Sequence, residues 1–302
     1  MKTVDFSEHL FRCSQLSKLM VGVKPNLTEN QAKELKRLSA KQSEGTITTK
    51  QTTTLGDLIK KRDAKPSLSK TTENHLSDVH KGVFFGRDRD INNKYLDKGI
   101  QAEEKSITLY SDLTGRYFEK NKNHFSNDFI KGTPDEVSDK VRDIKSSWSF
   151  HTFPLHDTEI PTDDYWWQLQ GYMSLTGVHE AELIYCLNDT PFKLIEDELR
   201  RLDWRHNVLE FSGEVRKERI DVVVECVSNL IYTREGLEKF IHQSPILQYE
   251  WFDNFHPIPD EYRMKKFSLK YEPEAIERLN EQIELCREHL NKITINMAEK
   301  VG

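Results

Sequence analysis

Two acidic residues and a lysine are grouped in the stretch GTPDEVSDKVRDIKSS, residues 132–147. Asp135 follows a proline, and Asp143 and Lys145 lie eight and ten residues further on. Carboxylate oxygens are preferred ligands of Mg²⁺ and Mn²⁺, and a nearby ammonium can hold a nucleophile or stabilise developing negative charge. This combination suits phosphodiester hydrolysis, because a divalent cation offsets the repulsion between an anionic substrate and its attacking oxygen.

A hairpin is the element that must position these groups. We expect SNDFIKG (126–132) as one strand, EVSD (136–139) as a turn and KVRDIKS (140–146) as the second strand. Because side chains alternate along a strand, Asp143 and Lys145 share one face and Arg142 takes the other. Asp135 can then reach the edge that carries Asp143 and Lys145.

The remaining charges of this stretch are expected to do no chemistry. Glu136 and Asp139 in the predicted turn, and Lys140 directly after it, are interpreted as solvated. Arg142 faces away from the other three groups, so a structural ion pair is expected there.

A third carboxylate is expected from a helix at residues 94–118. Its apolar stripe comprises Ile100, Ile107, Tyr110 and Leu113, and Gly115 suits its end. Glu103 lies four residues before Ile107 on this stripe, so its side chain is predicted to point inward. A buried carboxylate is costly without a cation, so Glu103 needs a lysine, an arginine or a metal as partner.

Further elements complete a prediction of fold class. Residues 162–177 read as a helix capped by Thr162 and ended by Gly177, and residues 181–187 read as a buried strand. Beyond residue 190 the pattern is mainly helical. The sequence predicts an α/β fold in which a small mixed sheet is flanked by helices, with a mainly helical C-terminal extension.

The domain organisation is predicted from changes in composition. Residues 1–255 are expected to form the main domain, with a polar insertion at about 25–90, and residues 256–302 a helical extension that packs on the core or self-associates. Within the insertion, ENQAKELKRLSAKQSE (29–44) is expected to be helical and EGTITTKQTTT (44–54) not. Ser14 is a plausible cap for a short N-terminal helix.

Composition limits the classes of function. The chain has 36% apolar and 31% charged residues, no run long enough to span a membrane and no signal-peptide pattern, so a cytoplasmic protein is expected. Four distant cysteines argue against a zinc finger or an iron–sulfur cluster. The net charge of −6 means that any polyanion must meet a focused site.

The order of these motifs resembles the PD-(D/E)XK nuclease superfamily, and within it the lambda-exonuclease (YqaJ-type) viral recombination nucleases. Five elements of the family pattern are matched along residues 5–20 and 94–187. They are Arg12-Cys13-Ser14, Gly99 with Glu103, Pro134-Asp135, Asp143-Ile144-Lys145, and Gln168 with Gln170.

The resemblance implies roles for the matched residues. Asp135, Asp143 and the Ile144 carbonyl would bind a metal, and Glu103 would bind or orient a metal-bound water or a second ion. Lys145 would activate the nucleophile and Gln168 would position water or phosphate. Contacts with DNA are suggested for Arg12 and Ser14, with Gln170 and Tyr172 as further candidates; Tyr172 could equally pack in the core.

The activity implied is that of a Mg²⁺-dependent exodeoxyribonuclease, with Mn²⁺ able to substitute, that digests linear duplex DNA from its ends. The resemblance also implies 5′-to-3′ polarity, a ring-shaped homotrimer, a single-strand annealing protein as partner, and the cytoplasm of a bacterial host. Two alternatives stay open. One is a structure-specific or single-strand nuclease of the same superfamily, and the other is a non-catalytic DNA-binding subunit.

Overall fold

The computed structural model describes residues 4–23, 27–62, 67–87 and 93–301. The chain divides into two compact units. One comprises Leu10–Ser14 and Asp90–Ile276, and the other comprises the described residues of Met1–His9, Gln15–Arg89 and Glu277–Gly302.

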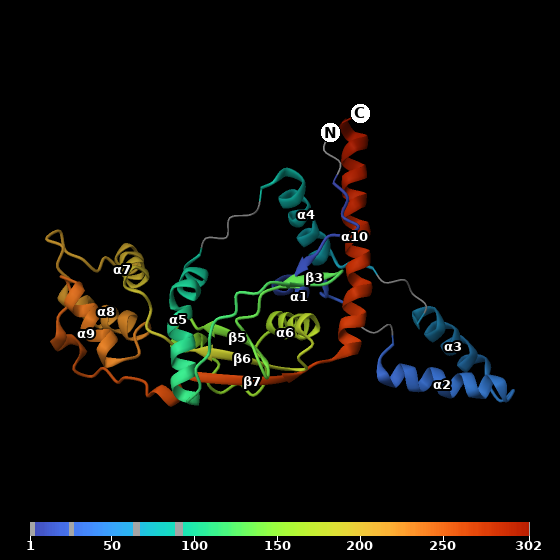
Figure 1. Ribbon diagram of the computed structural model, residues 1–302, viewed down its shortest axis with the longest axis horizontal. Helices are drawn as coiled ribbons and strands as arrows, with labels where there is room; N and C mark the ends of the chain where they lie inside the picture. Colours follow the sequence, from blue (N-terminus) through green and yellow to red (C-terminus); the bar gives the residue numbers. More distant parts are fainter. Residues whose placement is uncertain (1–3, 24–26, 63–66, 88–92, 302) are drawn as a thin grey trace. The chain divides into compact units, whose positions relative to one another are not determined.

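A mixed four-stranded sheet forms the centre of the first of these units (Figure 1). Its strands, in spatial order, are β4 (Glu136–Val137), β5 (Val141–Ser146), β6 (Glu180–Cys186) and β7 (Met264–Lys270). Strands β5 and β6 are parallel, and the two outer pairings are antiparallel. A smaller sheet has the order β1 (Phe11–Arg12), β3 (Ile130–Gly132), β2 (Phe125–Ser126).

Two helices cover opposite faces of the four-stranded sheet. On one face, Ile144 and Ile184 pack against Leu109 and Tyr110 of α5 (Lys94–Thr114). On the other, α6 (Asp163–Thr176) lies over β5 and β6, where the rings of Tyr165 and Tyr185 are 6.0 Å apart. The alternation of side chains along β5 therefore assigns its polar groups to two separate environments.

Helix α5 begins and ends where its capping residues indicate. The Asn93 side chain accepts the N–H groups of Tyr95 and Leu96, and Gly115 adopts the left-handed conformation at φ 67°. Helix α6 ends in the same way at Gly177, with φ 72°. Thr162 occupies the N-cap position of α6 but its side chain makes no capping hydrogen bond.

The segment between β6 and β7 folds as a helical cluster with its own apolar core. It contains α7 (Phe192–His206), α8 (Ile220–Ser228) and α9 (Arg234–Gln243), with short 3₁₀ turns at Lys217–Arg219, Tyr249–Phe252 and Asp260–Tyr262. Two further 3₁₀ turns of the chain are Cys13–Gln15 and Phe150–Thr152. The side chains of Val223, Val227 and Leu237 are almost fully buried in this cluster.

The second unit is helical. It contains α1 (Leu16–Leu19), α2 (Glu29–Ser43), α3 (Thr49–Arg62), α4 (Lys70–Phe85) and most of α10 (Pro273–Val301). Side chains of α10 hold the N-terminal segment and α1: Arg287 donates to the His9 carbonyl, and Gln282 donates to the Leu19 carbonyl at 3.1 Å. Among the described residues, no helix is both long and apolar enough to cross a bilayer.

The predicted fold class is confirmed, and so are the helices at 94–118 and 162–177 and the strand at 181–187. The prediction that EGTITTKQTTT is not helical is wrong for its second half, which opens α3. Leu55 and Leu58 of α3 are buried against Leu38 of α2, and this packing outweighs the low helix propensity of the threonines.

Three other predictions needed correction. The predicted first strand of the hairpin, residues 126–132, is divided between β2 and β3 of the smaller sheet, so the antiparallel partner of β5 is β4, which contains Glu136, and the turn lies at residues 138–140. Ile100 is 65% exposed and leaves the stripe of α5. Residues 264–270, expected within a helical extension, form β7; Phe267 is its one buried residue, so the strand carries little hydrophobic signal.

Candidate active site

Asp135, Asp143 and Lys145 come together at the end of β5. The Asp135 side chain accepts the backbone N–H of Ile144, with Oδ2 and N 2.7 Å apart. Lys145 Nζ lies 2.6 Å from Asp143 Oδ2. The predicted grouping of these three residues on one edge is therefore present in the folded chain.

The charges of this group shift one another's protonation equilibria. Burial, together with the neighbouring Asp143 charge, raises the pKa of Asp135 to about 7, although Lys145 and the hydrogen bond from the Ile144 N–H act in the opposite direction. Burial lowers the pKa of Lys145, but the charges of Asp143 and Asp135 raise it by more. Lys145 is consequently an ammonium at neutral pH.

Gln168 and Tyr172 of α6 extend the group. Gln168 Nε2 donates to Asp143 Oδ1 at 3.2 Å and to the Tyr172 hydroxyl at 2.9 Å. Burial, followed by the Asp143 charge, raises the pKa of Tyr172, so the phenol is neutral. A Cβ built on Gly132 would lie 2.5 Å from the Tyr172 ring, so glycine at this position lets α6 approach β3 closely.

Glu103 of α5 is paired with Lys120, with Oε2 and Nζ 2.7 Å apart. Its side chain is 28% exposed, so it lies at the rim of the site rather than in the core. The expected need for a cation is met here by a lysine from the loop after α5.

A cleft of about 810 Å³ opens at this end of the sheet. Predicted residues that line it are Ser14, Gly99, Glu103, Asp135, Ile144, Lys145 and Gln168. Aromatic and aliphatic residues that were not predicted also line it, among them Tyr95, Leu96, Ile100, Trp148, Tyr165 and Tyr185. The cleft thus has a charged end and an apolar side.

Three candidates for DNA contact are not among the residues that line the cleft. Tyr172 is buried, and its hydroxyl accepts from Gln168. Arg12 is exposed on β1 and is not among the lining residues. Gln170 is fully buried; its Nε2 donates to the Lys270 carbonyl and its Oε1 accepts the Glu272 N–H. Both polar ends of the Gln170 side chain are therefore engaged by the backbone that follows β7.

The opposite face of β5 carries a structural ion cluster, as predicted for Arg142. Its guanidinium lies 2.6 Å from Glu136 and 3.1 Å from Glu182, and the Tyr110 hydroxyl accepts from it at 3.0 Å. The prediction that Glu136 is solvated is wrong, because Glu136 is 8% exposed and pairs with the buried arginine.

The residues present fit a divalent cation. The carboxyl groups of Asp135 and Asp143, with the backbone of Ile144 between them, match the ligands of Mg²⁺, which commonly uses one or two carboxylates and keeps several waters. Within the described ranges, no three His, Cys, Asp or Glu side chains are close enough together to hold a metal. Glu103 is instead paired with Lys120.

Three supporting residues were missed in the sequence. Tyr165 presents its ring 5.2 Å from Lys145 Nζ, and its spacing of three and seven residues from Gln168 and Tyr172 places it on the same face of α6. Tyr185 pairs in register with Lys145 across β5 and β6. Both could have been found from the periodicities of α6 and β6.

Lys98 supports the cleft wall from inside the protein. Its Nζ donates to the Trp148 carbonyl at 2.8 Å, and burial lowers its pKa to about 7. A lysine in the interior of a helix gave no sequence signal for this role.

Solved structures share this fold. A phage-related exonuclease from Haemophilus somnus 129PT aligns with a TM-score of 0.59 and 19% identity, over 96% of this chain and 97% of that chain. An alkaline exonuclease from Laribacter hongkongensis (LHK-Exo) aligns with a TM-score of 0.51 and 10% identity, over 98% and 94%. No family model and no curated protein sequence matches the chain. The shared fold spans nearly the whole chain and confirms the architecture expected from the resemblance.

Proposed function

We propose that the chain is a Mg²⁺-dependent exodeoxyribonuclease that hydrolyses linear duplex DNA from its ends. The observation that carries the proposal is the grouping of Asp135, Asp143 and Lys145 at the end of β5, beside a cleft, in a fold shared with two exonucleases. Fold alone does not define an activity, whereas these side chains have the chemistry that phosphodiester hydrolysis requires.

Asp135, Asp143 and the Ile144 carbonyl would hold Mg²⁺, which when bound lowers the pKa of an attacking water and neutralises charge on the scissile phosphate. Lys145, kept protonated by both carboxylates, donates hydrogen bonds from Nζ to the attacking oxygen or to a phosphate oxygen. An ammonium in this state serves as a donor and not as the base that removes the proton.

Gln168 orients the Asp143 carboxylate. Its amide bridges Asp143 and the Tyr172 hydroxyl, so the carboxylate is fixed in orientation before substrate arrives. At the rim, the Lys120 ammonium holds the Glu103 carboxylate, which can accept a hydrogen bond from water entering the cleft. Ser14 lines the same cleft and can donate its hydroxyl to a terminal phosphate.

Polarity, assembly and partners follow from the resemblance alone. We propose digestion in the 5′-to-3′ direction, a ring-shaped homotrimer that encloses the DNA, and a single-strand annealing protein that receives the exposed strand. An acidic chain with a net charge of −6 would gain from such an arrangement, because a ring concentrates its few local cations around the duplex.

One experiment tests metal dependence, direction and end requirement together. Linear duplex labelled at either the 5′ or the 3′ end is digested in Mg²⁺, in Mn²⁺ or in chelator, alongside a covalently closed circle. We expect early release of the 5′ label, support by either metal, no digestion in chelator and an intact circle. Cleavage of the circle would favour the endonuclease alternative, and digestion in chelator would refute the metal site.

A further inference from the structure

The outer edge of β7 is unpaired. In the sheet order β4-β5-β6-β7, β7 pairs with β6 on one side, and no other strand in the described part of the chain lies along its second side. An edge of seven residues presents backbone donors and acceptors that can template another strand.

The register identifies which backbone groups point outward. The Leu187 N–H donates to the Arg263 carbonyl and the Tyr271 N–H donates to the His179 carbonyl. In an antiparallel pair such residues alternate, so the odd-numbered residues from 263 to 271 face β6. Lys266 and Ser268 therefore direct both N–H and C=O outward, whereas the Lys270 carbonyl is taken by Gln170.

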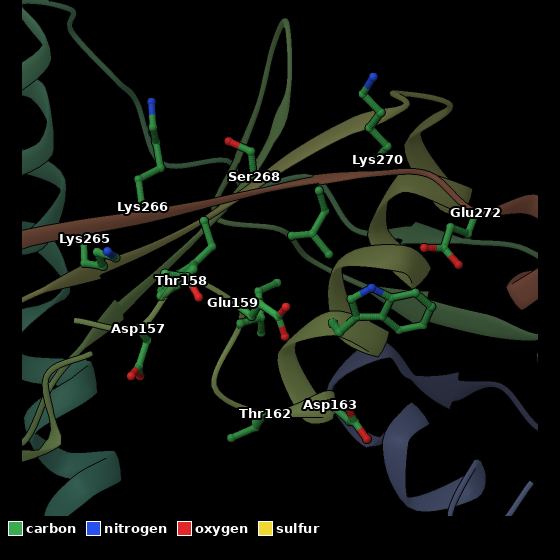
Figure 2. Close-up of a pocket in the computed structure, with 14 residues that line it drawn as sticks. Asp157, Thr158, Glu159, Thr162, Asp163, Lys265, Lys266, Ser268, Lys270 and Glu272 are labelled. Carbon is green, nitrogen blue, oxygen red and sulfur yellow. The ribbon is translucent and has the colours of Figure 1, made fainter. Parts of the chain in front are cut away.

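A groove of about 670 Å³ runs along this edge (Figure 2). One wall consists of six consecutive residues, 265–270, which point to both sides of the sheet, so the groove follows the strand edge itself. The opposite wall is formed by residues 157–160, the start of α6 and Trp166. The volume of the groove is in the range of ligand sites. Because consecutive residues of one strand line it, the groove suits a ligand in extended conformation.

The two sides of the groove differ in chemistry. Figure 2 shows Lys266, Ser268 and Lys270 projecting to one side of β7 and Lys265 to the other. A docked strand would meet Lys266 and Lys270 on one side, and the apolar Leu269 and Trp166 together with Lys265 on the opposite side. Carboxylates at Asp157, Glu159 and Asp163 line the loop wall and repel acidic side chains there. A shift of the docked strand by one residue would turn its acidic side chains toward these carboxylates, so that register is disfavoured.

A second copy of the chain is a poor occupant. Symmetric antiparallel pairing of two β7 edges brings Lys266 of each copy close to lysines of the other, and like charges at such positions are destabilising. Lysine on an exposed edge is a known device against self-pairing. The same lysines favour an occupant of opposite charge.

We propose that β7 is a docking edge for an extended protein segment in which acidic and apolar residues alternate, bound by strand addition. Its acidic side chains pair with Lys270 and with Lys266, which is 45% exposed beside Glu182. Its apolar side chains pack on the half-buried Leu269 and Trp166, and its backbone bonds to the outward groups of Lys266 and Ser268. This surface involves none of the residues assigned to the cleft chemistry.

The test uses the full chain and a fluorescein-labelled peptide of about nine residues that alternates glutamate and valine. Ser268→Pro removes the outward N–H and leaves the bonds to β6 intact, because Ser268 does not face β6. We expect fluorescence anisotropy to show binding to the parent that is about tenfold weaker for Ser268→Pro. Ser268→Val, which keeps the N–H, should bind like the parent.

Two further binding measurements test the proposal without relying on Ser268→Pro. A peptide N-methylated at alternate residues lacks half of its backbone donors and should lose binding to the parent. Lys270→Glu should weaken the acidic peptide and strengthen one that alternates lysine and valine. Equal binding to Ser268→Pro, or no binding to the parent at about 1 mM peptide, would overturn the proposal. So would a change in oligomeric state on Ser268→Pro, since the edge would then join copies of this chain.

Discussion

The Asp135 carboxylate is fixed by the backbone N–H of Ile144, with Oδ2 and N 2.7 Å apart. Ile144 stands between Asp143 and Lys145 in β5, so this one hydrogen bond ties the residue after Pro134 to the strand that carries the other two groups. The donor is a backbone group, and the juxtaposition therefore depends on the hairpin and not on the side chain at position 144.

Asp135 should make the metal-free protein less stable as the pH rises. Its pKa is raised from 3.8 to about 7 on folding, so between these values the folded chain holds a proton that the unfolded chain has lost. Stability from this group is complete below about pH 4 and is lost as pH rises through about 7. Asp135→Asn keeps an acceptor for the Ile144 N–H and has no such titration.

The measurement is the difference in the free energy of unfolding between parent and Asp135→Asn, in chelator, from pH 4 to pH 8. We expect the free energy of unfolding of the variant, relative to that of the parent, to increase as the pH rises over this range. We also expect Mg²⁺ at pH 8 to stabilise the parent but not the variant. A difference that does not change with pH would show that the Asp135 carboxyl is not desolvated as described.

Arg142 should be required for folding stability and not for chemistry. Its side chain is 3% exposed between Glu136 and Glu182, so Arg142→Met leaves two carboxylates without their main partner. We expect a loss of about 3–5 kcal/mol in urea unfolding. Asp139→Ala removes a partner that is 55% exposed and should cost less than about 1 kcal/mol. Similar losses for the two variants would contradict the cluster.

Gly132→Ala should disturb the site through Tyr172. The added Cβ would lie 2.5 Å from the Tyr172 ring and 3.0 Å from Cys13 Sγ, so α6 must shift and carry Gln168 with it. We expect a destabilisation of about 1–3 kcal/mol with slower DNA digestion. The control is Gly56→Ala in α3, where a Cβ meets nothing within 4 Å and should stabilise by about 0.5–1 kcal/mol. Unchanged melting of Gly132→Ala would exclude the close approach.

Strand and helix periodicities were sufficient to predict much of this site. Alternation along β5 separated Asp143 and Lys145 from Arg142, and both separations hold in the structure. The C-terminal ends of α5 and α6 followed from Gly115 and Gly177, because the left-handed cap is a local property. Thr162 marked the start of α6, but its side chain makes no capping hydrogen bond.

Features that depend on tertiary contacts could not be predicted. Gln170 was predicted to contact DNA, but it lies two residues after Gln168 on the helix and its side chain points elsewhere, where it bonds the backbone of Lys270 and Glu272 at the end of β7. Lys120, the partner of Glu103, lies in a loop, where no helix or strand periodicity indicates the direction of a side chain. Strand β7 has polar side chains on its exposed face, so its pairing with β6 was not visible in the pattern.

Substitution of Lys145 tests the central claim most directly. This claim is that the charged side chains at the end of β5 catalyse phosphodiester hydrolysis. The measurement is the single-turnover rate of nucleotide release from linear duplex DNA in Mg²⁺, compared among parent, Lys145→Ala and Lys140→Ala. Lys140 lies on the same hairpin, pairs with Glu180 and Glu182, and serves as the control. We predict a loss of at least about 100-fold for Lys145→Ala, with Lys140→Ala close to the parent. Digestion by Lys145→Ala at the parent rate would contradict the account.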